Sequence, residues 1–395
     1  MSFKRISLLV SIVCGALLLA ACTAVKIEGA APVVTPPVPT TPAPAPAELL
    51  RPATFSALPG WDKDDLREAM PAFLASCEAL IKKTEWKEAC TVARDVDISN
   101  ATAPRTFFES FFIPYQVVNP DGSDSGLVTG YYEPLLHGSR KRGGPYQIAL
   151  HRVPDDLLTV DLSSEYPALQ GMRLRGRLVG SKVLPYPSRA EMAQAGTLSG
   201  KELLWVDDPI DAFFLQVQGS GRVQLADGKE TVRVAYADQN GHPYKSIGRY
   251  LVDKGELKLE QASAQGIKAW VAANPARQQE LLNANPSYVF FKEEKLVDPK
   301  KGPKGALGVA LTPTRSIAID AQFLPLGAPV FLATTQPNSD DPLQRLVMAQ
   351  DTGGAIKGAV RVDFFWGFGA QAGENAGRMK QRGMLWVLLP RMATN

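Results

Sequence analysis

From about Leu127 to its C-terminus the chain alternates short strand-like runs with turns rich in glycine and proline. This alternation restricts the fold more than any other feature of the sequence. The runs are rich in β-branched and aromatic residues, as in GLVTGYYEPLLHG, MRLRGRLVG and SIAIDAQFLPLGAPVFLAT. Few of them are separated by the helical crossover that joins the parallel strands of a doubly wound sheet. The pattern therefore predicts a mainly β fold with helices (α+β) and β-barrel architecture.

Helical patterns lie before this region and in its middle. The segment DKDDLREAMPAFLASCEALIKK places acids early and lysines late, which favours a helix, and Pro71 allows two shorter pieces. EQASAQGIKAWVAAN and PARQQELLNAN are also interpreted as helices. The segment AFFLQVQGSGRVQLADGKETVRVAYA is interpreted as strands throughout, with Asp227-Gly228 as a hairpin turn.

Residues 1–22 have the form of a secretory signal peptide, with a basic MSFKR followed by an apolar run that is short for a membrane span. The run ends in Leu-Ala-Ala-Cys at Cys22, which resembles a bacterial lipobox. Small residues before that cysteine favour its lipidation over an ordinary signal peptide or an uncleaved anchor. Thr23 follows in place of an aspartate, which by analogy with such lipoproteins indicates outer-membrane sorting. The sequence thus predicts a periplasmic lipoprotein anchored to the outer membrane.

Residues 23–50 are expected to form a tether between that anchor and the folded protein. Within it, APVVTPPVPTTPAPAPA holds seven prolines and no charge. Such a stretch cannot bury a core and favours an extended, polyproline-like conformation.

Two cysteines, Cys77 and Cys90, remain after Cys14 leaves with the signal peptide and Cys22 carries lipid. Export would place them in an oxidising compartment, where a disulfide can form. Two buried free thiols are the alternative.

Composition and motifs exclude several classes of function. A formal net charge of +3 is too balanced for a nucleic-acid binder held by phosphate contacts. The three histidines, His137, His151 and His242, lie in separate segments without metal-ligand spacing. No GxSxG elbow or phosphate-binding loop is present. We therefore expect no metal, no cofactor and no nucleic-acid partner.

Carboxylates are the remaining chemical groups, and three aspartates lie in the C-terminal third. Asp320 precedes a Pro-Gly turn and is expected to hold it, whereas Asp351 begins an Asp-Thr-Gly that favours an Asx-type turn. Asp363 is followed at once by Phe-Phe-Trp, and apolar surroundings raise the pKa of a carboxyl, as a general acid requires. An aspartate held at a barrel rim by backbone N–H groups is the alternative for Asp363.

Several motifs, in order, resemble the membrane-bound lytic murein transglycosylase A family with its C-terminal three-aspartate (3D) domain. They are VTGYYEPLLHGSR, PYPSRAEM, DDPIDAFFLQVQGSGRV, NGHPYKSIGRYL, NPSYVFF, GALGVALTPTRSIAIDAQFLPLG and AQDTGGAIKGAVRVDFFWG. The resemblance implies a double-psi β-barrel domain from residues 51–128 and 298–395, with N-terminal helices. It also implies a second β-barrel inserted as residues 129–297, with a glycan groove between the two domains.

The resemblance further implies cleavage of the β-1,4 bond between N-acetylmuramic acid and N-acetylglucosamine in peptidoglycan, with a 1,6-anhydromuramic product and no addition of water. Asp363 aligns with the family's catalytic acid/base, and Asp351 and Asp320 are the supporting carboxylates. Glu133 and Asp211 are alternative acids, more in keeping with structural partners. The residues expected to bind glycan are Thr129, Gly130, Tyr131, Tyr132, Gln216, Gln218, Ser220, Arg222, Gly353 and Gly354.

Two other functions are compatible with these residues. One is a murein hydrolase (muramidase) that uses Asp363 and Asp351 as a carboxylate pair. The other is a non-catalytic lipoprotein that binds peptidoglycan. Peptidoglycan strands and the membrane are the expected partners, and the sequence leaves open any cell-wall synthesis or division complex.

Overall fold

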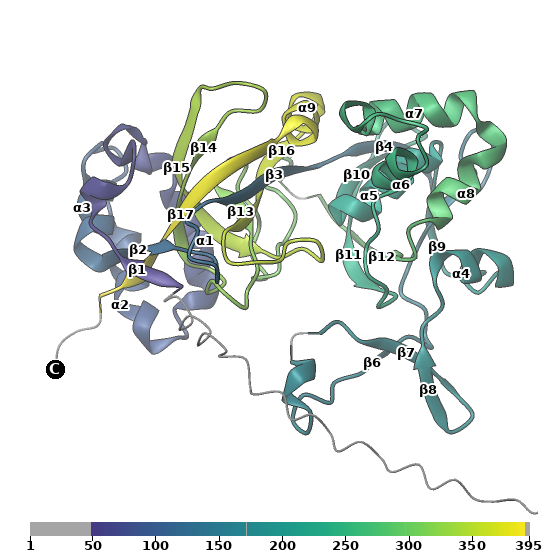
Figure 1. Ribbon diagram of the computed structural model, residues 1–395, viewed down its shortest axis with the longest axis horizontal. Helices are drawn as coiled ribbons and strands as arrows, with labels where there is room; N and C mark the ends of the chain where they lie inside the picture. Colours follow the sequence, from purple (N-terminus) through teal and green to yellow (C-terminus); the bar gives the residue numbers. More distant parts are fainter. Residues whose placement is uncertain (1–48, 171, 297, 392–395) are drawn as a thin grey trace, which may run out of the picture. The chain divides into compact units, whose positions relative to one another are not determined.

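The computed structural model describes residues 49–170, 172–296 and 298–391 (Figure 1). The predicted signal peptide, the lipidation site Cys22 and nearly all of the tether lie outside these described residues. Within the described ranges, none of the helices has both the length and the apolar character needed to cross a lipid bilayer.

A closed six-stranded barrel forms the first part of the fold (Figure 1). Its strands are paired in the order β3-β17-β14-β15-β13-β16, and β16 pairs in parallel with β3 to close the ring. Their bounds are β3 (Gly126–Glu133), β13 (Ser316–Ala318), β14 (Pro329–Thr335), β15 (Pro342–Asp351), β16 (Arg361–Phe368) and β17 (Lys380–Pro390). Strands β1 (Leu50–Pro52) and β2 (Phe112–Val117) extend the sheet beyond β17. The predicted β-barrel architecture is confirmed for this part of the chain.

Helices α1 (Met70–Leu80), α2 (Thr84–Val92) and α3 (Ala103–Phe111) lie against the barrel. Six of the seven residues of β14 are buried, because one face fills the barrel and the other is covered by the N-terminal segment, where Trp61 packs on Phe331. Pro71 lies in the first turn of α1, where a missing N–H costs nothing, so it helps to begin the helix and does not divide it. Cys77 and Cys90 form a disulfide between α1 and α2, which confirms that pairing.

Residues between β3 and β13 build a second sheet with its own core. The order is β12-β11-β10-β4-β9-β5. The bounds are β4 (Leu135–Ser139), β5 (Ile148–His151), β9 (Glu202–Val206), β10 (Ser220–Leu225), β11 (Thr231–Gln239) and β12 (Val289–Glu294). The edge strands β12 and β5 come close, but no ladder joins them among the described residues. Helix α5 (Pro209–Gln218) packs against both edges, so side chains seal the core there and the expected second barrel is an open sheet.

The segment 209–218 differs from the strand interpretation because its helix signals are local. Asp208 caps α5 by accepting hydrogen bonds from the N–H groups of Ile210 and Asp211, and Pro209 occupies the first turn. Gly219 ends the helix in the left-handed conformation at φ 84°. The hairpin turn at Asp227-Gly228, between β10 and β11, is confirmed.

The remaining helices are α4 (Arg189–Ala195), α6 (Ile247–Asp253), α7 (Ala264–Ala273), α8 (Gln278–Asn283) and α9 (Ala370–Arg378). Short 3-10 turns occur at Phe55–Ala57, Trp61–Lys63, Leu66–Glu68, Ala93–Asp95, Pro167–Leu169, Leu259–Gln261 and Pro275–Arg277. Helices α5 to α8 share a hydrophobic core and lie beside the second sheet (Figure 1).

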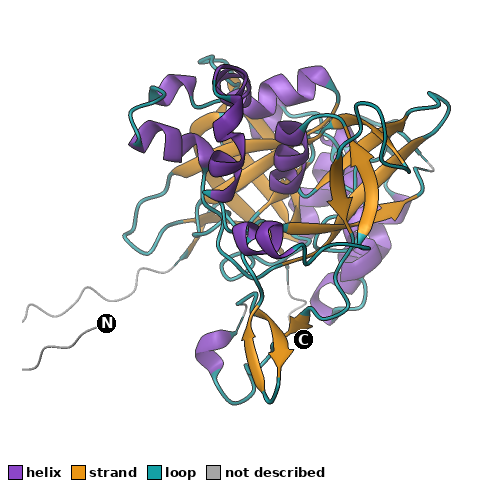
Figure 2. Cartoon of the chain, turned by 90° about the vertical axis from the view of Figure 1, so that its right-hand side faces the viewer, coloured by secondary structure: helices purple, strands orange, loops and turns teal. Residues whose placement is uncertain are grey.

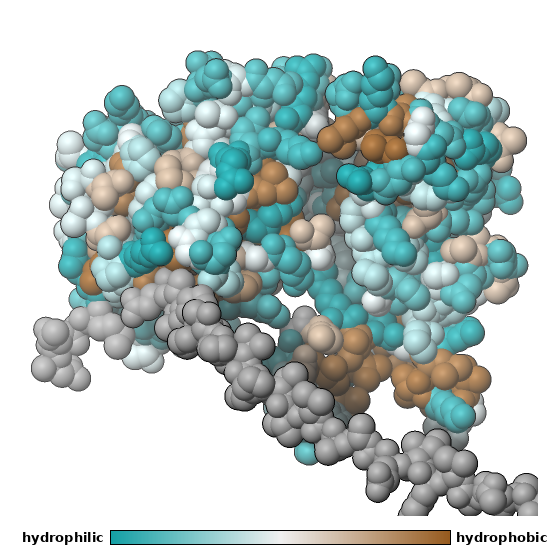
Figure 3. All heavy atoms as spheres, in the orientation of Figure 1, coloured by the Kyte–Doolittle hydropathy of each residue, from teal (hydrophilic) through white to brown (hydrophobic). Residues whose placement is uncertain are grey.

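A three-stranded sheet, β6 (Leu158–Thr159), β7 (Arg175–Val179) and β8 (Lys182–Pro185), stands apart from the two larger sheets (Figures 1 and 2). Hydrophobic side chains are exposed on it (Figure 3), and Leu178 keeps 64% of its surface accessible.

Candidate active site

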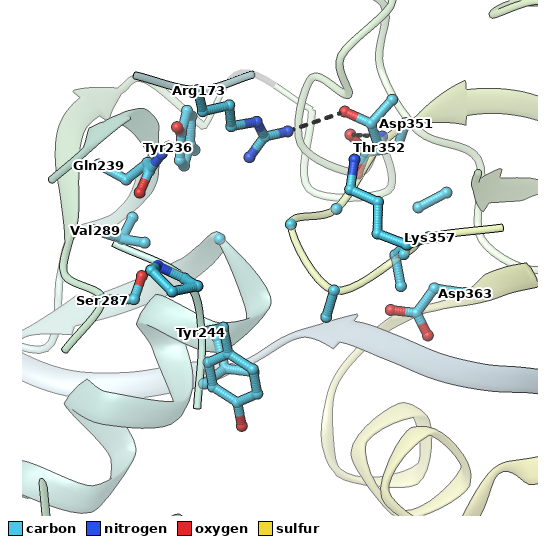
Figure 4. Close-up of a pocket in the computed structure, with 18 of the residues that line it drawn as sticks. Arg173, Tyr236, Gln239, Tyr244, Ser287, Val289, Asp351, Thr352, Lys357 and Asp363 are labelled. Atoms are coloured by element: carbon cyan, nitrogen blue, oxygen red, sulfur yellow. Dashed lines mark hydrogen bonds between the residues drawn. The ribbon is translucent and has the colours of Figure 1, made fainter. Parts of the chain in front are cut away.

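A cavity of about 630 Å³ contains Asp363 and Asp351 in its wall. The C-terminal strands and the β15–β16 loop form one side of it. The second sheet, helix α5 and the segment before β7 form the other, and side chains from both sides face the cavity (Figure 4). A volume of this size is in the range of small-molecule sites.

Asp363 lies on β16 directly opposite Thr129 of the parallel strand β3. The register brings the Thr129 hydroxyl to 2.6 Å from Asp363 Oδ1, to which it donates a hydrogen bond. Burial raises the pKa of Asp363 to about 6, although the hydrogen bond from Thr129 and the positive charge of Arg361 act to lower it. A carboxyl with that pKa retains a substantial protonated fraction near neutral pH.

Asp351 ends β15 and is held by three donors. Its Oδ1 accepts hydrogen bonds from the N–H groups of Ala306 and Thr352, both at 2.9 Å, and its Oδ2 accepts one from the Tyr131 hydroxyl at 3.1 Å. Burial raises the pKa of Asp351, and these hydrogen bonds oppose the increase. The side chain is therefore fixed in place far more firmly than that of Asp363.

The two carboxylates are separated by a strand. Ala318 of β13 is the cross-strand neighbour of Asp351 on one side and of Asp363 on the other. Two strand spacings place their backbones about 9–10 Å apart. The short strand β13 thus sets the distance between the two acids.

Asp320 lies outside the cavity lining and is 5% exposed. Its Oδ2 accepts a hydrogen bond from the N–H of Gly358, and its Oδ1 accepts one from the N–H of Gln322. Asp320 therefore holds the loop between β15 and β16, which includes Gly353 and Gly354.

The structure brings only part of the predicted glycan-binding set to the cavity. Those that line it are Tyr131, Gln216, Gln218, Gly353 and Gly354. Thr129 contacts the cavity through Asp363. Gly130 faces Trp366 and helix α9 closely, where a Cβ would come within 2.7 Å of the indole nitrogen. Tyr132 donates its backbone N–H to Gln218 Oε1.

Ser220 and Arg222 also lie outside the lining. Arg222 is 3% exposed and donates to Glu133, which is fully buried, so both are structural partners and not groove residues. Asp211 is paired with Lys268 at 2.6 Å. No group of three or more potential metal-ligating His, Cys, Asp or Glu side chains occurs in the described ranges.

Several cavity residues were not singled out from the sequence. Tyr236 and Tyr244 each keep 39% of their surface exposed, and Arg173, Gln239 and Lys357 face the same space (Figure 4). Tyr244 lies in the segment NGHPYKSIGRYL, whose resemblance to the family could have indicated that this tyrosine faces the cavity. No sequence motif indicated Arg173, because it reaches the cavity from a distant segment. Its Nη2 lies 3.4 Å from the Thr352 hydroxyl.

Comparison with known proteins agrees with this architecture. Two family models match: the MltA specific insert domain over residues 127–292 and the 3D domain over residues 315–389. The chain is 34% identical over 281 residues to the membrane-bound lytic murein transglycosylase A of Escherichia coli strain K12, covering 69% of this chain and 68% of that protein.

Solved structures give the same result. The lytic transglycosylase LtgG of Burkholderia pseudomallei is 51% identical, with a TM-score of 0.60 over 88% of this chain and 96% of that one. Escherichia coli MltA with bound chitohexaose is 28% identical, with a TM-score of 0.63 over 87% and 94% of the two chains. The chain therefore belongs to the membrane-bound lytic murein transglycosylase A family and is a lytic murein transglycosylase.

Proposed function

We propose that this enzyme cleaves the β-1,4 bond between N-acetylmuramic acid and N-acetylglucosamine in peptidoglycan without adding water, with Asp363 as its single acid/base. The observation that carries this proposal is the environment of Asp363: its carboxyl lies in the wall of a cavity of about 630 Å³, and burial raises its pKa to about 6.

One carboxyl suffices because the nucleophile belongs to the substrate. Asp363 first donates its proton to the departing glycosidic oxygen. The 6-hydroxyl of the muramic ring then attacks the anomeric carbon, and the Asp363 carboxylate takes up the hydroxyl proton. This intramolecular attack has a high effective concentration and forms the 1,6-anhydro ring.

Asp351 and Asp320 serve as supporting carboxylates in this proposal. A retaining glycosidase requires two carboxyl groups about 5–5.5 Å apart. The backbones of Asp351 and Asp363 are about 9–10 Å apart across β13. Three hydrogen bonds hold the Asp351 side chain in place. These observations do not fit a retaining carboxylate pair. An inverting pair, whose carboxyl groups lie about 6.5–9.5 Å apart, is distinguished from the single-acid reaction by the Asp351→Asn variant described below.

The glycan is expected to lie along the cavity that Asp363 lines. Aromatic faces stack on sugar rings, and the exposed rings of Tyr236 and Tyr244 offer such faces opposite the acids (Figure 4). Gln216 and Gln218 supply amides for hydroxyl and N-acetyl groups. The chitohexaose bound to the Escherichia coli relative supports a saccharide ligand.

The same family membership supports a domain division. We assign residues 51–128 and 298–395 to a double-psi barrel domain and residues 129–297 to the inserted domain. Signal peptide 1–22, lipidation of Cys22 and tether 23–50 would attach the enzyme to the outer membrane on its periplasmic side. The relatives' description as membrane-bound supports that attachment.

The test is digestion of purified sacculi, with product ends identified by mass spectrometry. We expect 1,6-anhydromuramic ends from the wild type, and a loss of about 10²–10⁴-fold in rate for Asp363→Asn. Reducing, hydrated ends as the main product would reject the transglycosylase reaction.

Asp351→Asn separates the alternatives. The single-acid mechanism predicts a smaller loss of activity for Asp351→Asn than for Asp363→Asn, whereas a paired hydrolase predicts equal losses. A binding lipoprotein predicts that even the wild type releases no soluble fragments.

A further inference from the structure

A second cavity, of about 380 Å³, lies in the inserted region. Its walls come from strands β5 and β9 and from helices α4, α5 and α8. Its lining includes residues of β5 but none of β12. Gln216 lines both this cavity and the one that contains Asp363, so a single side chain borders both spaces.

One wall carries a buried cation without an acidic partner. Arg189 is 7% exposed, and the rings of Phe213 and Tyr288 lie within 5 Å of its guanidinium. Its hydrogen bonds go to neutral acceptors only: the carbonyls of Asn285 and Ser287, and Gln216 Oε1. Nη1 forms no hydrogen bond among the described residues and keeps some accessible surface, and desolvation lowers the pKa of Arg189 to about 10.

The same cavity also contains an acidic side chain. Glu202, on β9, lines it and forms no ion pair with any described lysine or arginine. Glu202 is partly exposed, so the costly buried charge in this cavity is that of Arg189, which has no acidic partner. Because Arg189 and Glu202 do not pair with each other, a ligand that carries both a carboxylate and an ammonium group would complement both.

The remaining walls suit a peptide. Strand β5 is an edge strand, paired with β9 on one side only among the described strands, and its residues Ile148 and Ala149 line the cavity. Helix α5 and strand β12 lie close to this edge, so a peptide in the cavity would contact side chains of β5 and would not extend the sheet. Trp205 supplies an aromatic surface in the same wall.

We propose that this second cavity binds the short peptide attached to peptidoglycan glycan strands, through its free carboxylate and ammonium groups. This inference rests on the proposed function, because a glycan in the first cavity would bring its attached peptide towards the second across Gln216. Binding of the peptide then adds affinity for substituted strands without altering the chemistry at Asp363.

The test measures binding in an Asp363→Asn background, so that no probe is cleaved. Two probes are titrated by calorimetry: a murein tetrasaccharide with its peptides, and chitohexaose, which has none. Ala193→Trp fills the mouth of the second cavity from the exposed face of α4, and Ala195→Trp on the same helix, outside the lining, is its matched control. Glu202→Gln removes the anion without changing the side chain's size.

We expect Ala193→Trp to weaken binding of the peptide-bearing probe about tenfold, equivalent to about 1.4 kcal/mol. Glu202→Gln should weaken it severalfold, and both variants should leave chitohexaose within twofold. Ala195→Trp should alter neither titration. Equal effects on both probes, or no effect of either variant on the peptide-bearing probe, would overturn the second site while leaving the proposed function intact. If the parent protein binds neither probe, the proposed function and the second site both fail.

Discussion

At the scale of single residues, the site depends on how differently two similar aspartates are held. Asp351 receives three hydrogen bonds, while Asp363 receives one, from Thr129. Donors stabilise the charged form of a carboxylate and burial destabilises it. With a single donor against desolvation in the cavity wall, Asp363 is the acid that keeps its proton to higher pH.

Replacing Thr129 with valine tests that balance. The hydroxyl lowers the pKa of Asp363, so its loss should raise that pKa further above 6. A general acid must be protonated, and activity therefore falls as pH rises through its pKa. One hydrogen bond is worth about 1 kcal/mol, so we expect the falling limb of the pH–rate profile to move up by roughly 0.5–1 pH unit.

The matched control is Thr334→Val, in the same barrel, whose hydroxyl donates to the Arg382 carbonyl and has no contact with the acids. Its pH–rate profile should match that of the wild type. A limb that stays in place or moves to lower pH in Thr129→Val would contradict the role given to this hydroxyl.

At the scale of elements, the sequence predicted several strands correctly but missed helix α5. The β-branched and aromatic residues correctly indicated β3 and β11, and Asp227-Gly228 indicated the turn between β10 and β11, although four consecutive residues of β11 are buried and do not alternate. Helix α5 was misread because its apolar residues are bulky and nearly continuous, as in a buried strand. The capping residues Asp208 and Gly219 held the missing information.

The disulfide between α1 and α2 gives a prediction at this scale. It closes a short loop, with a sequence separation of 13, and a loop of that size contributes about 3 kcal/mol by chain entropy. We expect reductant to lower the urea midpoint of the wild type. In Cys77→Ala/Cys90→Ala, reductant should leave the midpoint unchanged.

Activity per folded molecule should be the same in both proteins, because neither cysteine lines either cavity. A wild-type midpoint insensitive to complete reduction would show that the cross-link does not constrain the unfolded chain.

At the scale of the whole described fold, one buried acid joins the segments that cross between the barrel and the inserted region. Glu133, at the end of β3, accepts hydrogen bonds from Arg222 and Arg233. The same arginines donate to the carbonyls of Pro299 and Lys301 on the returning segment. The segment that leaves the barrel and the segment that returns to it are therefore held together by one buried cluster of charged side chains.

Glu133→Gln should be strongly destabilising, because it leaves two buried guanidinium groups without their anion. Breaking such a buried pair costs about 3–5 kcal/mol. Glu293→Gln is the matched control: its partner Arg140 is 48% exposed, and a pair of that kind contributes at most about 1 kcal/mol. Thermal unfolding compares the two, and equal shifts would argue against the fastening role of Glu133.

The sequence indicated the barrel and placed Asp363 and Asp351 in one site through motif resemblance. It could not indicate Arg173, Tyr236 or the burial of Arg222, because these depend on which distant segments meet. Local context marks a residue as polar or aromatic, but only the packed fold decides whether its side chain faces a cavity or a buried carboxylate.

Strand β3 carries three of these contacts at alternate positions: Thr129 to Asp363, Tyr131 to Asp351, and Glu133 to the arginines. Alternate residues share a face, so a one-residue insertion or deletion in the strand before Thr129 would turn all three away together. Such a change in length should remove the hydrogen bonds to Asp363 and Asp351, and the ion pairs of Glu133, at the same time. The exposed turn at residues 336–341, by contrast, has room to vary in length during evolution.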